Sequence, residues 1–443
     1  MLTRRTWCRA MAAPALLAVV PTRVVHAGQP LPTPPVWDPA AIRTRAQQAL
    51  DENLIPFWYP RSIDARGGHT VHYGPQGEPL PGGTKMIVTQ ARMLWLSSRL
   101  LRARPGTAVL RTSADAGFAF LRDRMWDAAH GGFYWEVDPT GREVRRAGKH
   151  LYGQAFGLYA LAEYVRATDS REARALADAL FDRLERTAHD ATSGGYRESF
   201  TREWTRPAGD VAGPLGAPPD VKLMNTHLHL LEALTAYVQA GAGPLARRRL
   251  AELVDIETHA VVRSGWVACT DRHRSDWTPI LDAPWDRVSY GHDLENIWLV
   301  IDALHALDAP VAPFRDLFTQ LFAYSQQHGE DTEAGGFFDS GAPRAAADRR
   351  GKTWWVQAEA LVAALAMLEL TGDRRYADVA ARTWSWIDTR QIDWRHGEWH
   401  EAIGADGTVG RQNKAHAWKA GYHNGRALIE VLERLPRLAH TTR

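Results

Sequence analysis

A loop signal that recurs six times along the chain limits the folds open to it more than any other feature. Each copy has a glycine next to another glycine, a glutamate or a tryptophan. Counted from the first glycine of each copy, the spacings are 64 (131−67), 63 (194−131), 71 (265−194), 70 (335−265) and 62 (397−335). Near-equal intervals of this size indicate a repeated structural unit. The copies are Gly67-Gly68-His69, Gly131-Gly132-Phe133, Gly194-Gly195-Tyr196, Ser264-Gly265-Trp266, Gly335-Gly336-Phe337 and Gly397-Glu398-Trp399.

Long stretches between these loops have apolar residues three and four positions apart, which is the pattern of amphipathic helices. Each period therefore holds about two helices and a short hairpin. Six such units predict an all-α fold, an (α/α)6 barrel toroid with the hairpins and loops at one end, where a ligand funnel is expected. An open solenoid is the alternative. The clearest helical stretches are Gln90–Arg102, Gly153–Arg166, Arg171–Thr187, Thr226–Ala240, Asp293–Leu307, Val356–Leu370, Arg374–Thr389 and Asn424–Leu435.

The first residues have the features of an export signal of the twin-arginine type. Arg4 and Arg5 precede an apolar stretch from Ala10 to Val20, and cleavage is expected after Ala27. We therefore expect a signal peptide over 1–27, a Pro-rich arm over 28–37 and one catalytic barrel domain over 38–438. The mature protein is expected to be exported or periplasmic. An uncleaved anchor or a mis-assigned start is the alternative.

Charge and cysteine content exclude several classes of partner. Removal of residues 1–27 takes away four arginines and no acid, so the formal charge falls from +2 to −2 (2 − 4). A near-neutral surface gives no electrostatic reason to expect nucleic acid or a membrane as partner of the mature form. Cys269 is then the one cysteine left, so stability must come from packing. A monomer or weak homodimer is expected.

Three polar blocks lie at the edges of apolar helical stretches and each contains histidine. They run from Asn225 to Glu232, from Tyr290 to Trp298 and from Trp418 to Arg426. Histidine can take and give a proton near neutral pH, so several such blocks that converge suggest general acid–base chemistry. A buried histidine with a structural hydrogen bond is the alternative for each, and it is favoured for His227.

Helical spacing indicates which side chains of a block share a face. Asn225 and His229 are four apart, and His292 and Glu295 are three apart, so Glu295 is expected to orient His292. Arg92 with Trp95, Trp355 with Glu359, and His423 with Arg426 repeat the pattern.

Metal and nucleotide sites have little support in the sequence. His227, His229 and Glu232 could be ligands, but there is no His-Glu-x-x-His motif and no cysteine cluster, so no metal is expected. A Gly-rich phosphate loop and a dinucleotide fingerprint are also missing, so no cofactor is expected.

Tryptophans next to the polar blocks suggest a sugar ligand. The chain has 18 tryptophans, and Trp298, Trp354, Trp355 and Trp418 adjoin polar side chains that could bind hydroxyl groups. The segment Pro207–Asp220, rich in proline, glycine and alanine, is either a flexible surface loop or a mobile lid over the site.

Six stretches, in order along nearly the whole mature chain, resemble the N-acylglucosamine 2-epimerase superfamily, most closely its cellobiose 2-epimerase branch. The resemblance implies an (α/α)6 barrel, in agreement with the repeat, and an enzyme without a cofactor. The stretches are Gln90–Trp95, Tyr152–Phe156, Asn225–Glu232, Tyr290–Trp298, Trp354–Ala360 and Trp418–Arg426.

The same resemblance implies a role for each candidate residue. His292 and His423 would remove and return the proton at C2 of an open-chain sugar, with Glu295 supporting His292. Arg92, Asn225 and His229 would bind the O1/O2 region and stabilise the enediolate. The residues that would hold the sugar rings are Tyr152, Trp355, Glu359 and Trp418.

Three functions remain open at this level. The first is a 2-epimerase or aldose–ketose isomerase acting on the reducing end of a mono- or disaccharide of the cellobiose, mannose or N-acylglucosamine type. The second is a glycoside hydrolase on the same barrel, which needs two carboxylates, for example from Asp293, Glu295 and Glu359. The third is a periplasmic sugar-binding protein without turnover.

Overall fold

The computed structural model describes residues 35–441, with side chains to residue 438. The predicted signal peptide and most of the predicted arm lie outside the described residues. The described part is one compact unit. It contains no helix that is both long and apolar enough to cross a membrane.

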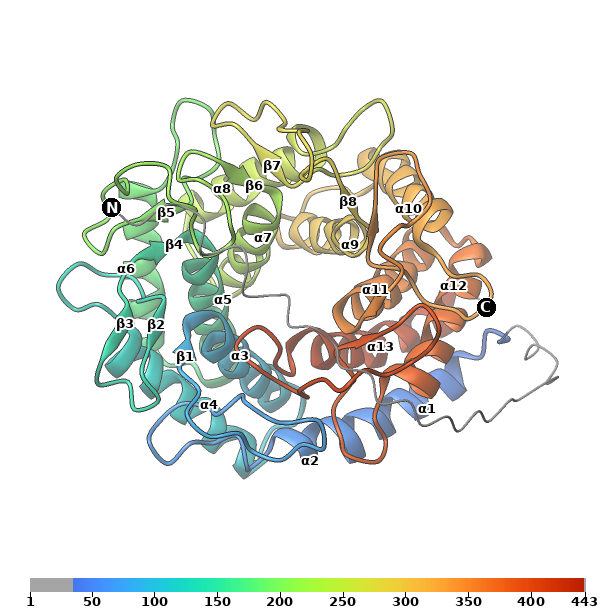
Figure 1. The fold of residues 1–443 in the computed structure, drawn as a ribbon, viewed down its shortest axis with the longest axis horizontal. Helices are drawn as coiled ribbons and strands as arrows, with labels where there is room; N and C mark the ends of the chain where they lie inside the picture. The colour runs from blue at the N-terminus through green and yellow to red at the C-terminus, as the bar shows by residue number, and fades with distance from the viewer. Residues whose placement is uncertain (1–34, 442–443) are drawn as a thin grey trace, which may run out of the picture. The chain divides into compact units, whose positions relative to one another are not determined.

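Six helices form an inner ring (Figure 1). Each contacts the next along the chain, and the last, α13, also contacts the first, α3, so the ring closes on itself. The predicted α/α toroid is therefore confirmed. The inner helices are α3 (Ile87–Ala103), α5 (Leu151–Thr168), α7 (Met224–Gln239), α9 (Tyr290–Ala306), α11 (Trp354–Thr371) and α13 (Tyr422–Thr441).

An outer helix packs on each inner one, and the sixth pair joins the two ends of the chain. Helix α1 (Pro39–Gln48) packs against α13. Its start is fixed by Asp38, which accepts hydrogen bonds from the amides of Ala40 and Ala41, and by Pro39, which takes the first helical position. The other outer helices are α4 (Ala108–Phe120), α6 (Arg171–Thr187), α8 (Pro244–Asp255), α10 (Arg315–Gly329) and α12 (Arg374–Trp386).

Short helical segments extend several outer helices or join elements. They are η1 (Ala49–Leu54), α2 (Ile55–Trp58), η2 (Leu121–Met125), η3 (Ile256–Ala260), η4 (Ala312–Phe314) and η5 (Ile387–Gln391). The predicted stretch Arg374–Thr389 thus covers α12 and the start of η5.

The two rings differ in how their helices are buried. In α11 nearly every residue is buried, whereas α6 buries a single stripe that includes Ala173, Ala177, Leu180 and Leu184. A helix that is apolar on all sides needs neighbours on all sides, and a striped helix covers a core with one face. The sequence pattern therefore assigns α11 to the inner ring and α6 to the outer ring.

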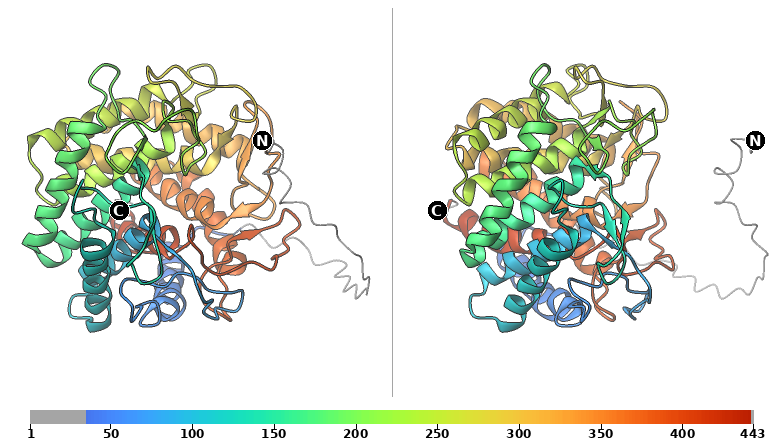
Figure 2. Two further views of the ribbon diagram at one scale, coloured as in Figure 1. Left: turned by 60° about the vertical axis from the view of Figure 1, so that its left-hand side comes forward. Right: turned by 90° about the vertical axis from the view of Figure 1, so that its left-hand side faces the viewer.

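Short antiparallel strands gather with the long loops at one end of the helical ring (Figure 2). Five of them lead directly into inner helices, so that the first turns of those helices open toward this end. The strands are β1 (Lys85–Met86), β2 (Glu136–Val137), β3 (Val144–Arg146), β4 (Lys149–His150), β5 (Ser199–Phe200), β6 (Lys222–Leu223), β7 (Arg272–His273), β8 (Val288–Ser289), β9 (Ser340–Gly341), β10 (Lys352–Thr353) and β11 (Ala402–Ile403). They form one sheet ordered β1-β2-β3 and the pairs β4-β5, β6-β7, β8-β9 and β10-β11.

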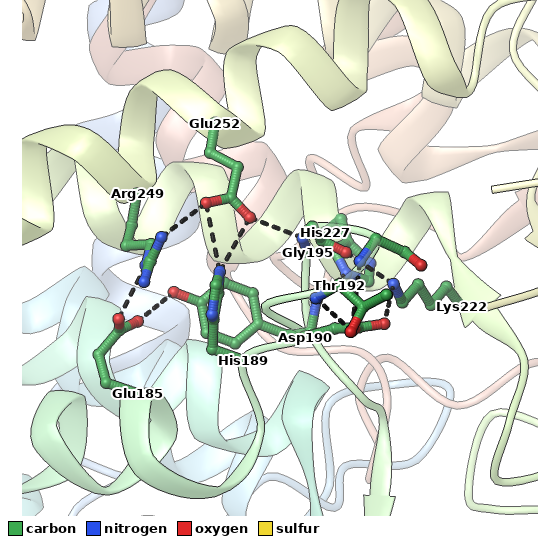
Figure 3. Close-up of polar contacts among 12 residues, drawn as sticks. Glu185, His189, Asp190, Thr192, Gly195, Lys222, His227, Arg249 and Glu252 are labelled. Atoms are coloured by element: carbon green, nitrogen blue, oxygen red, sulfur yellow. Dashed lines mark hydrogen bonds and ion pairs between the residues drawn. The ribbon is translucent and has the colours of Figure 1, made fainter. Parts of the chain in front are cut away.

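In five of the six glycine loops, a buried lysine forms an ion pair with an aspartate of the loop. In the third repeat the Lys222 ammonium lies 2.9 Å from Asp190 and donates to the Gly194 carbonyl, while Glu252 accepts from the Gly195 amide (Figure 3). Charged groups out of water are tolerated when they are paired and hydrogen-bonded in this way. The five pairs are Lys85–Asp64, Lys149–Asp127, Lys222–Asp190, Lys352–Asp331 and Lys414–Asp393.

The fourth repeat departs from this pattern. Arg263 stands at the aspartate position of its loop, and Val288 stands where four other repeats have a strand lysine before the inner helix. The predicted glycine signal at Gly265 is also out of register, because the left-handed residue of this loop is Val267. The bridge that closes the loop joins Val262 to Cys269.

Candidate active site

A cavity of about 380 Å³ opens among the first turns of the inner helices. Nine of the ten residues nominated from the sequence line it, and they come from all six inner helices or the loops that precede them. These nine are Arg92, Tyr152, Asn225, His229, His292, Glu295, Trp355, Trp418 and His423. The tenth, Glu359, is buried behind them. The convergence expected from the repeat is therefore present.

His423 is oriented by Glu359. Its Nδ1 lies 2.6 Å from Oε1 of Glu359, and both side chains are almost fully buried. Burial, with Arg92 and Arg426 nearby, lowers the pKa of His423 well below its usual value, so the ring is neutral. With the proton on Nδ1, the Nε2 lone pair is available as a base. The interpretation of Glu359 as a ring-holding residue is thus incomplete, because its carboxylate contacts the imidazole.

His292 has different surroundings. Its ring packs on Trp355 with 4.8 Å between centroids, and it is half-buried. Burial lowers its pKa to about 4, and the nearby Asp339 opposes this effect. Both imidazoles therefore favour the neutral form. Each has an acid nearby, Asp339 for His292 and Glu359 for His423.

The expected pairing of Glu295 with His292 is not formed. Oε1 of Glu295 instead accepts from Nη2 of Arg426 at 2.6 Å. Helical spacing correctly places Glu295 and His292 on one face, but the guanidinium is the stronger partner. Oε2 of Glu295 has no hydrogen-bond partner, and burial raises the pKa of this carboxyl to about 7.

Arg426 holds three carboxylates below the cavity. It contacts Glu232, Glu295 and Glu359, and its guanidinium lies 4.6 Å from the centre of the Trp298 ring. The arginine lowers the pKa of Glu232 to about 2 despite burial. Because a buried charge is costly without a partner, these contacts fix the whole group.

His229 and Tyr422 extend this network. Nδ1 of His229 lies 3.1 Å from Oε2 of Glu232, and the Tyr422 hydroxyl donates to the same carboxylate at 2.6 Å. The Nε2 edge of His229 is then free for a ligand, as the predicted role of this residue requires.

Glu295, Glu359 and His423 are also close enough together to hold a metal ion, since their ligand atoms lie within 4.8 Å of one another. Arg426 already donates to both glutamates. A cation at this point would have to displace the guanidinium, so the group fits an arginine-neutralised acid–base pair better than a metal centre.

Arg92 points its guanidinium at the cavity from α3. It donates to the Tyr152 hydroxyl at 3.1 Å and to the Trp418 carbonyl at 3.3 Å, and it lies against the Phe156 ring at 4.3 Å. Its Nε–H has no partner. Together these contacts fix a cation that still has unused N–H donors, including the Nε–H.

Four residues that line the cavity each carry a buried polar atom without a hydrogen-bond partner among the described residues. Besides the Arg92 Nε–H and Oε2 of Glu295, they include Oδ1 of Asn225 and the indole N–H of Trp354. A buried donor or acceptor without a partner costs free energy, so such atoms in one cavity indicate a ligand that supplies the missing bonds. Donors and acceptors in a mixed set suit a ligand rich in hydroxyl groups.

Aromatic and aliphatic groups form the rest of the wall. Trp355 lies against His292, and Trp418, with 38% of its surface exposed, stands at the mouth. The loop Pro207–Asp220 contributes Leu215. An Arg206–Asp220 ion pair of 2.5 Å closes the base of this loop, and Arg272 donates to the Gly216 carbonyl. The loop is therefore part of the cavity wall, whereas a movement of this loop stays a prediction.

His227 has the structural role favoured for it. Its Nδ1 donates to the Leu223 carbonyl at 2.8 Å, and its Nε2 accepts from the Tyr196 amide at 3.0 Å. Both ring nitrogens are used by backbone groups, so this histidine holds the third loop against α7.

Leu215 and Tyr422 are among the contributors that were not assigned a role from the sequence. Leu215 lies in a loop without periodicity, and no local pattern indicates that it reaches the cavity. Tyr422 is four residues before Arg426, so the helical spacing could have placed it beside the guanidinium, which its hydroxyl does contact.

A second polar cavity, of about 200 Å³, lies around Arg99, Glu163 and Glu433, toward the other ends of the inner helices. No histidine lines it. The acid–base groups thus belong to the cavity on the loop side.

Comparison with known sequences agrees with this geometry. Residues 67–427 match the family described as N-acylglucosamine 2-epimerase (GlcNAc 2-epimerase). The chain belongs to the N-acylglucosamine 2-epimerase family. It is therefore an isomerase.

Individual relatives of the family cover most of the chain. A cellobiose 2-epimerase from Bacteroides fragilis is 31% identical over 398 residues, which are 88% of this chain and 98% of the relative. A D-mannose isomerase from Marinomonas mediterranea is 24% identical over 88% of this chain and 96% of its own length. The solved structure of a cellobiose 2-epimerase from Bacillus thermoamylovorans superimposes with a TM-score of 0.82 at 29% identity, covering 89% of this chain and all of that one.

Proposed function

We propose that this isomerase inverts C2, or moves the carbonyl from C1 to C2, at the reducing end of a mono- or disaccharide without a cofactor. The observation that carries the proposal is the pair of neutral imidazoles, His292 and His423, that line one cavity together with the Arg92 guanidinium. The relatives named as cellobiose 2-epimerase and D-mannose isomerase support the two outcomes.

The reaction starts on the open-chain sugar. Nε2 of His423 takes the C2 proton, the C–H electron pair becomes the C1–C2 double bond, and the carbonyl π electrons move to O1. The resulting enediolate carries its negative charge near Arg92, whose free Nε–H is a suitable donor. A fixed cation at a developing oxyanion lowers the barrier.

The second half of the reaction needs a protonated imidazole. His292 suits this role because Asp339 favours its protonation. It takes up a proton from solvent before the reaction and gives it to the sugar, while His423 keeps the proton that it removed and then returns it to solvent. A proton returned from the opposite face of the planar enediolate to C2 gives the epimer. A proton delivered to C1 gives the ketose, and the same groups serve both products.

A deuterium experiment tests the proposal. The protein is incubated in heavy water with cellobiose, lactose, glucose, mannose or N-acetylglucosamine, without added metal or nucleotide, and the C1 and C2 protons are followed by NMR. We expect deuterium at C2, or at C1 for an isomerase, and its loss in His292→Ala and His423→Ala. No exchange on any sugar would overturn the proposal.

The two alternative functions give different results in the same incubations. A glycoside hydrolase increases the amount of reducing sugar, whereas epimerisation does not. A sugar-binding protein binds without exchange, and replacement of either histidine then changes only its affinity. Trp418 and the unpartnered polar atoms would serve all three functions, but an imidazole held by a carboxylate is needed only for proton transfer.

We also propose that the protein is exported and works in the periplasm as a monomer or weak homodimer. The support is the twin-arginine pattern at Arg4 and Arg5. Fractionation of cells that express the full chain, with Arg4→Lys/Arg5→Lys as the comparison, tests the first part. Retention of the natural protein in the cytoplasm would contradict it. Sedimentation of the mature protein tests whether it is a monomer or a weak homodimer.

A further inference from the structure

Each inner helix holds the glycine loop that precedes it through one side chain near its start. Gln90, Gln154 and Gln357 do this in the same way. Each accepts a hydrogen bond from a loop amide and donates one to the carbonyl of the same residue, which is His69, Phe133 or Phe337. A neutral group that both accepts and donates therefore fixes the helix start to the loop.

The fourth repeat has an acid at this position, directly after His292. Oδ1 of Asp293 accepts from the Cys269 amide at 2.8 Å, as the glutamines do from theirs. Oδ2 lies 3.4 Å from the Ser325 hydroxyl of α10. The side chain is fully buried. Asp293 thus reproduces the accepting half of the glutamine contact, and its donating half requires a proton on the carboxyl.

No cation compensates a charge on Asp293 among residues 35–438. The lysine–aspartate pair that locks five other loops is missing here, and Asp293 forms no ion pair with any of those residues. The titratable groups around it are Cys269 of the loop, Tyr290 of α9 and Tyr324 of α10. Cys269 in turn lies near Glu257 and Arg263. Ionisation of Asp293 would leave a buried negative charge without a partner.

We propose that Asp293 is a positioning residue that acts as a neutral carboxylic acid in place of the repeat's glutamine, and so fixes the first turn of α9, from which His292 reaches the cavity. The effect of Asp293 on catalysis rests on the proposed function of His292. The protonation state of Asp293 is independent of that function. Burial raises the pKa of Asp293 to about 7, which agrees with a mostly neutral acid in mildly acidic solution. Above that range the negative charge would weaken the contact with the loop and shift His292.

The stability of Asp293→Asn as a function of pH tests the protonation state without any substrate. Asparagine keeps an acceptor and a donor and cannot ionise. Well below the unfolded pKa of about 3.9, the aspartate is protonated in both the folded and the unfolded chain. As the pH rises from 4 to 7, the unfolded chain ionises and the folded chain does not, so the natural protein loses stability relative to Asp293→Asn. We expect the melting temperature of the variant to exceed that of the natural protein by several degrees at pH 8 and by little at pH 4.

Gln357→Glu is a matched variant, because it places an acid at the same position of the fifth repeat. We expect it to introduce a similar pH-dependent loss of stability. A difference in melting temperature between Asp293→Asn and the natural protein that is the same at pH 4 and pH 8 would overturn the proposal, since it would mean that Asp293 is charged when folded.

The role of Asp293 in positioning His292 is tested separately, by the pH dependence of kcat. The ratio of kcat at pH 8.5 to kcat at pH 6.5, measured by deuterium exchange, is expected to be several-fold higher in Asp293→Asn than in the natural protein. An unchanged ratio would contradict the link to His292. If deuterium enters none of the sugars, the proposed function fails. The melting temperatures still test whether Asp293 is protonated in the folded protein.

Discussion

Nδ1 of His423 lies 2.6 Å from Oε1 of Glu359, although 64 residues separate them, and Arg426 donates to the same oxygen at 2.8 Å. The carboxylate therefore fixes the imidazole tautomer while the arginine one turn later on α13 holds the carboxylate. Such a carboxylate–imidazole pair leaves the other ring nitrogen as a base of fixed direction.

Replacement of Glu359 by glutamine should impair the chemical step. The amide can present its N–H to Nδ1 and so favour the wrong tautomer, and in comparable pairs this costs about 10⁴-fold in kcat. We expect Glu359→Gln to lower the rate of deuterium exchange by about 10²- to 10⁴-fold with little change in KM. Glu369→Gln, at the far end of the same helix, is the control. Equal rates for Glu359→Gln and the control would rule out the orienting role.

Removal of the arginine should destabilise the fold. Arg426→Met leaves Glu232, Glu295 and Glu359 buried without their cation, and loss of one member of a buried ion network costs about 3–5 kcal/mol. The loss should be smaller at pH 4 than at pH 7, because the glutamates can then take up protons. Urea unfolding at both pH values measures it, and an equal loss at both would contradict this account.

Trp418 should contribute to binding more than to chemistry. Its ring is half-open to solvent at the mouth of the cavity, where it can stack on a sugar unit. Stacking of this kind is worth about 0.5–1.5 kcal/mol, so Trp418→Ala should raise KM about three- to tenfold and leave kcat nearly unchanged. Trp394→Ala removes a similarly exposed indole on the surface and serves as the control. A fall in kcat without a rise in KM would mean that the ring positions the reacting groups.

The lowered pKa values of the two histidines predict an unusual pH dependence of kcat/KM on the acid side. An ordinary histidine base loses activity as the pH falls through about 6.5. Here burial lowers the pKa of His292 to about 4 and that of His423 well below 6.5, so the base stays neutral in mildly acidic solution. We expect kcat/KM at pH 5.5 to be no lower than at pH 7. Circular dichroism at both pH values verifies that the protein stays folded, and a tenfold fall in the folded protein would refute the prediction.

The buried lysine–aspartate ion pair of a glycine loop should contribute to the stability of the fold but not to catalysis. Lys352 donates to the Gly335 carbonyl and lies 2.8 Å from Asp331, with both groups largely buried. Lys352→Met should cost about 3 kcal/mol in urea unfolding because Asp331 is left unpaired. The double variant Lys352→Met/Asp331→Leu should recover much of this loss. A double variant as unstable as the single one would show that the ammonium–carbonyl contact dominates.

Local patterns were sufficient for much of this protein. Helical periodicity and the glycine interval predict the paired helices, because both follow from contacts near in sequence. The same spacing places His229 and Asn225, or His292 and Glu295, on shared faces that do reach the cavity. Glycine spacing failed in the fourth repeat, where Val267 takes the left-handed conformation that glycine takes elsewhere.

Partners that are distant in the chain could not be predicted from spacing. Glu295 was assigned to His292 three residues away, but it binds Arg426, which is 131 residues away. Glu359 reaches His423 in the same long-range manner. A choice among such partners depends on the closed ring, in which charge pairing outweighs proximity along a helix.

The pairing of α1 with α13 has a consequence for how the protein is made. Among the described helices α1 is synthesised first and α13 last, so the ring cannot close until α13 has been made. His423 and Arg426 are on α13, and the acid–base site is therefore assembled only once this helix has been made. A nascent or truncated chain that lacks α13 would expose the apolar sides of α1, α3 and α11 and would lack His423, so the presence of α13 is a condition for turnover.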